Sequence, residues 1–310
     1  MWCESSIGKI DSAAGTAPVC ETIAHMNEEV RPVDSTPAET RAEMLRLSAR
    51  GYTQLRHVLV QLPDAGDSRG STLAQVVRGR KHRALVLYLL MLACWPWLEK
   101  RREPLAAAVW VRALSADKGL TWSASTLSRA WRDLEGMGLI ERRREDRAVR
   151  VAPRREDGGA PYEAPGGRKD WWNAYFSLPD AFWEEEWFAR LSLPALVMLL
   201  VVAKETNGKS KEVWLTYAKT EPWYGIKDQT AQKGLKELEG WGLLHRRMEK
   251  IKAPLSPTGH TVRTWYSLTG PFGREARQAM QERAATERKK RLVSPATTDS
   301  TTPRADKATS

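Results

Sequence analysis

Two stretches of this chain, SASTLSRAWRDLEGMGLIERRRE at 123–145 and KDQTAQKGLKELEGWGLLHRRME at 227–249, align without a gap. Nine of the 23 aligned positions are identical, and the offset is constant at 104 residues. Self-similarity at a fixed offset is the sequence signature of a repeated structural unit. We therefore expect the chain to contain one small domain twice.

Each copy is predicted to begin with a buried helix. The segment ALVLYLLML at 84–92 aligns with ALVMLLVVA at 195–203 after a shift of seven further residues. Because both segments are apolar nearly all round, each is expected to lie at the centre of its copy. A shorter element follows, and its start in the second copy, VWLTY at 213–217, indicates a short strand before a brief helix.

The two aligned stretches each predict a helix with one packing face. Apolar or small residues recur there at helical spacing: Leu127, Ala130, Trp131 and Leu134, and Ala231, Gly234, Leu235 and Leu238. Polar residues at the start, Ser123 or Ser125 and Asp228, are expected to cap these helices. Gly136 and Gly240 are expected to end them in the left-handed conformation.

The opposite faces and the following hairpins, 140–155 and 243–268, carry the candidate DNA-binding residues. These side chains are able to read base edges or to hold phosphates. On the helices they are Ser123, Ser125, Ser128, Arg129 and Arg132, matched by Lys227, Gln229, Gln232, Lys233 and Lys236. On the hairpins they are Arg142, Arg143, Arg144, Arg147 and Arg150, with Arg246, Arg247 and Lys250 in the second copy. The alternative is a solvated charged edge that discourages strand aggregation.

The segments LEGMGLIERRR at 134–144 and LEGWGLLHRR at 238–247 resemble the junction between recognition helix and wing in the winged-helix superfamily. The resemblance implies that the third helix of each copy enters the major groove and that the hairpin wing touches the backbone or the minor groove. The tandem arrangement also resembles plasmid replication initiators and winged helix-turn-helix transcriptional regulators. Bulky Trp122 and Trp131 depart from the usual aliphatic pattern of the first copy.

The expected fold is mainly α with small β wings: two tandem winged helix-turn-helix domains, N-terminal helices and disordered tails. The predicted divisions are a disordered region at 1–35, a helical extension at 36–79, domain 1 at 80–155, a Pro/Gly linker at 156–170, domain 2 at 171–272, a basic helix at 273–292 and a disordered tail at 293–310. The tryptophan-rich stretch 171–191 is expected to be an appended helix packed on the core, with stacking on bases as the alternative.

Charge indicates a polyanionic partner. The chain has a formal net charge of +11, although residues 1–40 hold two basic and seven acidic side chains. Nucleic acid therefore leads the expected partners. The start has no secretory signal, and the longest apolar run, 84–98, is shorter than the roughly 18 residues of a membrane span. Three cysteines without C-x-x-C spacing are consistent with a reducing cytoplasm.

Catalysis finds little support in the sequence. The five histidines are scattered without metal-ligand spacing, and no nucleophile motif such as G-x-S-x-G occurs. The segment AKETNGKS at 203–210 matches a loosened phosphate-binding loop, but the strand-like VWLTY follows where a helix is required. We therefore expect no enzyme, no metal and no cofactor.

The favoured function is sequence-specific binding of double-stranded DNA by a transcriptional regulator. One alternative is a replication initiator of a plasmid or integrated element that binds iterated origin repeats and recruits replication machinery. Another is a protein-interaction adaptor built on winged helices. The apolar stripe in 36–79 either dimerises the chain or docks on it, and the basic helix at 273–292 either follows phosphates or is solvated.

Overall fold

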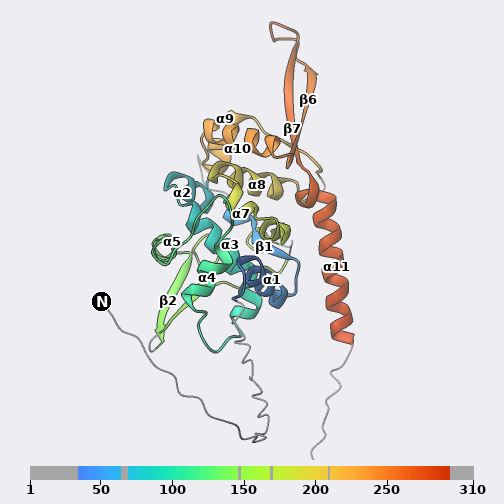
Figure 1. The fold of residues 1–310 in the computed structure, drawn as a ribbon. Helices are drawn as coiled ribbons and strands as arrows, with labels where there is room; N and C mark the ends of the chain where they lie inside the picture. The colour runs from blue at the N-terminus through green and yellow to red at the C-terminus, as the bar shows by residue number, and fades with distance from the viewer. Residues whose placement is uncertain (1–33, 64–68, 146–147, 168–169, 209, 294–310) are drawn as a thin grey trace, which may run out of the picture. The chain divides into compact units, whose positions relative to one another are not determined.

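The computed structural model describes residues 34–63, 69–145, 148–167, 170–208 and 210–293. Helices dominate this part of the chain, and its small sheets are all antiparallel, as the sequence predicts (Figure 1). The segments 1–33 and 294–310, which belong to the expected disordered tails, lie outside the described residues. None of the described helices has the length and apolar character needed to cross a membrane.

The two predicted core helices are α3 (His82–Leu98) and α8 (Leu193–Glu205). Every residue from Ala84 to Cys94 on α3 and from Ala195 to Lys204 on α8 is buried. Long side chains at consecutive positions leave no polar face, so both helices are surrounded by other elements. The prediction of two central apolar helices is confirmed.

The elements after each core helix follow the same order in both copies. The first copy continues with α4 (Ala107–Leu114), α5 (Ala124–Gly136) and the hairpin of β2 (Ile140–Glu145) and β3 (Ala148–Pro153). The second copy continues with β5 (Val213–Trp214), α9 (Tyr217–Tyr224), α10 (Asp228–Gly240) and the hairpin of β6 (Leu244–Lys252) and β7 (His260–Leu268). In this copy β5 adds to the hairpin as a third strand, in the order β5-β7-β6.

The N-terminal segment joins the two copies. It contains α1 (Pro37–Ser48), β1 (Tyr52–Arg56), the 3₁₀ turn η1 (His57–Leu59) and α2 (Thr72–Arg78). The expectation of helices alone is wrong, because β1 pairs antiparallel with β4 (Tyr175–Pro179) at the start of the second copy. Its apolar stripe is buried within this chain, at Met44, Leu45, Leu55, Val58 and Leu59. Those side chains are therefore covered without a partner chain.

The tryptophan-rich stretch is not one helix. After β4 it forms two short helices, α6 (Ala181–Glu184) and α7 (Trp187–Arg190), separated by Glu186 at a φ of 58°. Pairing of β4 with β1 holds the first part extended, which local helical spacing does not reveal. Phe182, Trp183 and Phe188 are fully buried, so packing rather than base stacking explains these aromatic residues.

The stretch 156–170, expected as a linker, is packed in part against the N-terminal segment. Glu156 is fully buried, and its carboxylate accepts hydrogen bonds from the backbone N–H and the guanidinium of Arg56 at 3.0 and 2.9 Å. The Arg56 guanidinium also lies 5.3 Å from the ring centroid of the buried Tyr162. A charge that is buried needs a paired charge, and this pairing ties β1 to the start of the stretch. The chain from Ser35 onward therefore forms one compact unit.

The basic C-terminal helix is present as α11 (Arg274–Val293). Its first turns pack on the second copy, where the buried guanidinium of Arg277 donates to the carbonyl oxygens of Phe272 and Ala203. Gln281 contacts the hydroxyl of Ser177 on β4. Beyond these contacts most of the described side chains of α11 are exposed, as both alternatives for this helix require.

Candidate nucleic-acid interface

The two presented helices start differently. Ser123 caps α5: its hydroxyl accepts from the backbone N–H of Thr126 at 3.3 Å, and the Thr126 hydroxyl accepts from the backbone N–H of Ser123 at 2.7 Å. In the second copy Asp228 is the first residue of α10 rather than its cap, and the capping position belongs to Lys227, which makes no side-chain capping bond. Asp228 still favours the helix, because an acidic side chain in the first turn complements the helix dipole.

Both presented helices end in the same way. The prediction that Gly136 and Gly240 supply the left-handed residue is wrong, since both are the last residues of their helices. The left-handed residues are Gly138 and Gly242, each with a φ of 69°. The turn is completed two residues later than predicted because Met137 and Trp241 still adopt right-handed helical angles. This turn sets the direction in which each hairpin leaves its helix.

The predicted free faces are free in the structure. The packing positions of α5 and α10 are buried, as expected. The eight predicted contact positions within the helices are exposed: Ser125, Ser128, Arg129, Arg132, Gln229, Gln232, Lys233 and Lys236. Their spacing of three and four residues places each set of four on one side of its helix.

The four basic residues of these faces have no internal partner. Among the described residues, no hydrogen bond or ion pair is made by the side chains of Arg129, Arg132, Lys233 or Lys236. Four of the five acidic residues on the same two helices have other partners: Asp133 pairs with Lys81, Glu135 with Arg142 and Glu239 with Arg246, and Glu237 bonds to Ser192. Each helix therefore presents two uncompensated positive charges beside neutral polar groups.

The hairpin arginines of the first copy are more constrained than the sequence indicates. Arg142 forms an ion pair with Glu135 on α5, and Arg143 lies 3.4 Å from Glu141 while its side chain stays 78% exposed. Arg150 donates to backbone carbonyl oxygens of Arg101, at 3.1 Å, and Arg102. Arg144 is exposed but is also engaged in an interaction within the protein. Arg147 lies outside the described residues.

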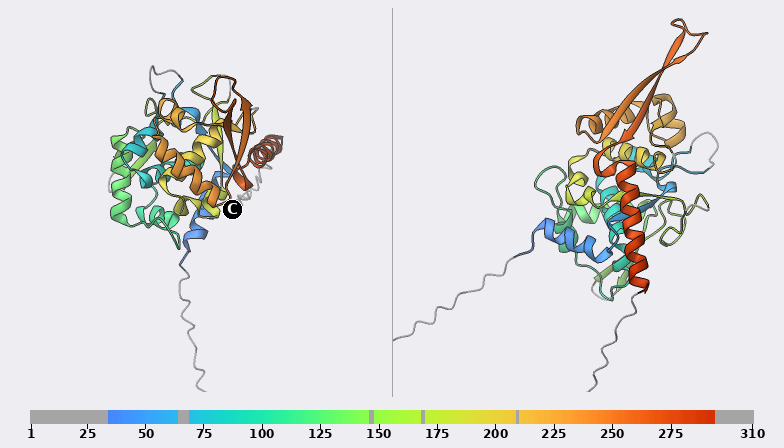
Figure 2. Two further views of the ribbon diagram at one scale, coloured as in Figure 1. Left: turned by 90° about the horizontal axis from the view of Figure 1, so that it is seen from above. Right: turned by 90° about the vertical axis from the view of Figure 1, so that its right-hand side faces the viewer.

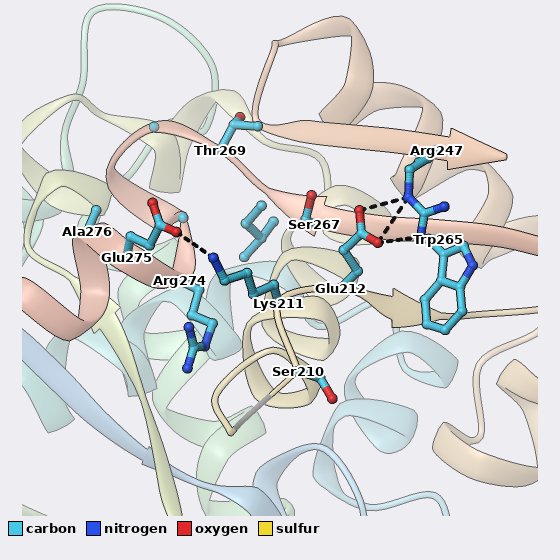
Figure 3. A pocket seen from close by; sticks show the side chains of 13 residues that line it. Ser210, Lys211, Glu212, Arg247, Trp265, Ser267, Thr269, Arg274, Glu275 and Ala276 are labelled. Carbon is cyan, nitrogen blue, oxygen red and sulfur yellow. Dashed lines mark hydrogen bonds and ion pairs between the residues drawn. The ribbon is translucent and has the colours of Figure 1, made fainter. Parts of the chain in front are cut away.

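The same pairing occurs in the second copy. Arg246, the counterpart of Arg142, lies 3.2 Å from Glu239, the counterpart of Glu135. Arg247 donates from two nitrogens to the carboxylate of Glu212, at 2.7 Å for the shorter ion pair (Figure 3). This guanidinium holds the pKa of the Glu212 carboxyl below its usual value. Lys250 is exposed, and its side chain makes no hydrogen bond or ion pair with any residue in the described part of the chain.

An open pocket of about 780 Å³ lies beside Arg247, at the base of the second hairpin (Figure 3). Its charges are largely compensated. Lys211 lies 3.1 Å from Glu275, and the guanidinium of Arg274 donates to the carbonyl oxygen of Gly208 at 3.0 Å. An anion here would have to compete with bonds that already exist, so the pocket does not form a preorganised phosphate site.

The phosphate-loop-like segment 203–210 does not form that motif. Its first residues end α8, and the next element is β5 rather than a helix. The buried ammonium group of Lys204 lies 2.6 Å from the carboxylate of Glu205 and 2.6 Å from the amide oxygen of Gln61. Lys209 lies outside the described residues. A phosphate-binding loop needs a helix N-terminus directly after it, and this condition is not met.

The described residues contain no group of acidic, histidine or cysteine side chains arranged to hold a metal ion. Cys94 is buried on α3, and burial raises the pKa of its thiol to about 12. A thiol that stays protonated is a poor nucleophile.

The second hairpin carries basic residues that the sequence repeat does not reveal. Lys252 and Arg263 lie outside the aligned stretch. Lys252 is the last residue of β6, and Arg263 lies on β7, which begins at His260. Arg263 and Lys219 both lie over the ring of Trp214, with the guanidinium carbon and the ammonium nitrogen 4.6 and 4.3 Å from its centroid. The hairpin predicted at 243–268 already spans Lys252 and Arg263, so the sequence contained the signal needed to include them among the candidates.

Comparisons of this chain with models of known protein families, with curated proteins and with solved structures found no match.

Proposed function

We propose that this protein binds double-stranded DNA in a sequence-specific manner as a tandem winged-helix regulator. The observation that carries the proposal is the repeated exposed face: Arg129 and Arg132 on α5 and Lys233 and Lys236 on α10 occupy equivalent positions and have no internal partner among the described residues. A single exposed basic helix is common on protein surfaces. The same unpaired pattern at the same positions of two copies favours a shared ligand with many negative charges.

The dimensions of these helices suit the major groove. Each presented helix has 13 residues, which corresponds to roughly 20 Å of length. The major groove is about 12 Å wide and admits an α-helix. Ser128 and Gln232 sit between the basic positions and can form hydrogen bonds with base edges, whereas the basic side chains can bond to guanine or to phosphate.

The hairpins take a supporting role in this proposal. Arg142 and Arg246 each hold a glutamate at the end of the presented helix, so their first effect is to fix the angle between helix and hairpin. Exposed Arg143 and Lys250 remain available for the phosphate backbone. Mutations of Ser128 or Gln232 on the helices should therefore change sequence preference, and mutations on the hairpins should weaken binding to all sequences.

Because both copies belong to one compact unit, the spacing between the two presented helices is set by the protein. We therefore propose a bipartite recognition site with constant spacing between its parts. This feature also suits a replication initiator that binds repeated origin sequences, which is the second candidate function. The positions of the bound fragments separate the two: promoter regions favour the regulator, and one cluster of repeats favours the initiator.

The test is selection of bound duplexes by the purified full chain at about 150 mM salt, where non-specific charge binding is weak. Both a random-sequence duplex library and fragments of the source genome are used, and the bound DNA is sequenced. Enrichment of a two-part motif supports the proposal. Recovery of the input composition alone would contradict it and would favour a protein-interaction adaptor.

A further inference from the structure

The hairpin of the second copy is longer than its fold requires. Its strands β6 and β7 have nine residues each, compared with six each in β2 and β3. The first copy shows that six residues are sufficient to close the same arrangement of helices. The outer part of the longer ribbon extends beyond α9 and α10 (Figure 2), and all residues from His245 to Lys250 are exposed. Such a two-stranded ribbon contributes little to folding stability.

The tip of this ribbon is an ordered turn. The backbone N–H of Ala253 donates to Gly259 at 2.9 Å, and the backbone N–H of Ser256 donates to Ala253 at 2.9 Å. The hydroxyls of Ser256 and Thr258 both donate to the carbonyl oxygen of His260 at 2.9 Å. The tip therefore has a defined shape that does not depend on any other part of the protein.

This turn presents an apolar side chain to solvent. Leu255 is 102% exposed, the highest value among the large exposed hydrophobic residues of the described chain. Exposed Pro254 and Pro257 flank it within the turn. Prolines restrict the backbone and offer no N–H donor, so the end of the ribbon is stiff and apolar.

The ribbon behind the tip is suited to a polyanion. Register places Lys250 opposite Val262 and Lys252 opposite His260, so these residues share one face with Met248. Both lysines are exposed and have no partner in the described residues, and Met248 and Val262 are 65% and 50% exposed. Cations beside apolar groups complement the phosphates and deoxyriboses that line a DNA groove, whereas an apolar protein surface would leave both lysines unpaired.

We infer that the β6–β7 ribbon is a DNA-bending arm that inserts Leu255 between base pairs from the minor groove. Apolar wedges of Leu or Pro at minor-groove base steps unstack the bases and kink the duplex. Lys250 and Lys252 hold the adjacent phosphates, and the stiff tip keeps the wedge in place. The inference rests on the proposed DNA binding and adds an activity to it: the bound duplex is bent at the step that the tip reaches.

The test uses the full chain and the duplex enriched in the selection, placed at the centre or at the end of fragments of about 150 base pairs, which is one persistence length. A kink at the centre slows the complex in a gel more than a kink at the end. We expect the wild type to show a bend of about 20 to 90° by this comparison. Leu255→Ser should abolish most of the difference, and Leu255→Phe, which keeps an apolar wedge, should retain it.

Two controls separate the possible failures. Leu47→Ser removes another exposed leucine, 43% exposed on α1, and should leave the bend unchanged. Circular dichroism and the melting temperature of Leu255→Ser should match the wild type, because Leu255 is fully exposed. A wild type that binds the duplex without bending it, or a Leu255→Ser variant that bends it equally, overturns the arm but leaves DNA binding intact. Failure of the wild type to select any duplex removes the proposed function and the arm together.

Discussion

Glu237 on α10 accepts a hydrogen bond of 2.8 Å from the backbone N–H of Ser192, the residue that caps α8. Its carboxylate also accepts from the Ser192 hydroxyl. In the first copy Asp133 occupies the equivalent position on α5 and pairs with Lys81, which precedes α3. In both copies one acidic residue therefore joins the presented helix to the start of the core helix.

Removing the Glu237 carboxylate should destabilise the second copy. Glu237→Ala leaves the backbone N–H and the hydroxyl of Ser192, at the start of α8, without their acceptor. The free energy of unfolding should therefore fall by about 1 to 2 kcal/mol. Urea unfolding followed by tryptophan fluorescence measures the change. Glu221→Ala is the matched control, because Glu221 is exposed on α9 and its side chain bonds to no described residue. Equal stability of both variants would show that the bond to Ser192 has no structural effect.

Two glycines of one turn should respond in opposite directions. Gly138 has a φ of 69°, so Gly138→Ala should cost roughly 1 kcal/mol through strain of the left-handed backbone. Gly136 is helical and has open space where an alanine methyl group would lie, so Gly136→Ala should stabilise by about 0.5 to 1 kcal/mol. Gly242→Ala and Gly240→Ala provide the same comparison in the second copy. Thermal unfolding of the four variants shows whether each substitution raises or lowers the stability. A Gly136→Ala variant less stable than the wild type would contradict the assignment of Gly136 as an unstrained helical residue.

Stability should depend on pH through Asp180. Burial, with a smaller effect from Glu184, raises the pKa of this carboxyl to about 7 from an ordinary value of 3.8. The folded state thus binds the proton more tightly than the unfolded state. The stabilising contribution is complete below about pH 4 and is lost as the pH rises through about 7.

Asp180→Asn removes this titration while keeping a neutral side chain of the same shape. The variant should match the wild type near pH 4 and exceed it above pH 7, by on the order of 4 kcal/mol. Urea unfolding of both proteins across this range gives the difference at each pH. Asp117→Asn, at an exposed site, is the control. A difference that does not change with pH would rule out this role for Asp180.

The salt dependence of DNA binding should show whether the basic residues of the presented helices bind phosphates. Replacing both Lys233 and Lys236 with Ala should reduce the slope of log affinity against log salt concentration by about 0.9 for each phosphate that the variant no longer binds. Fluorescence anisotropy with the selected duplex, at several salt concentrations, measures the slope. Lys118→Ala removes another exposed lysine without a described partner, outside the helix face, and should leave the slope nearly unchanged. An unaltered slope in the double variant would exclude phosphate binding by these two lysines.

The sequence alone predicted the features that depend on local pattern. The repeat, the two buried helices, the packing faces of α5 and α10 and both hairpins follow from hydrophobic spacing and turn residues within short windows. Exposure of Arg129 and Lys233 was predictable for the same reason, because a residue opposite the apolar stripe of a helix points to solvent.

The tertiary structure decided the features that join distant residues. Strand β1 forms because Tyr52–Arg56 pairs with β4, which lies more than 100 residues later in the chain. Burial of Glu156 depends on its ion pair with Arg56. The hairpin arginines Arg142 and Arg246 are paired because Glu135 and Glu239 face them across the helix end. Local periodicity carries no information on such partners, since hydrogen bonds and ion pairs between distant segments arise only when the core brings those segments together.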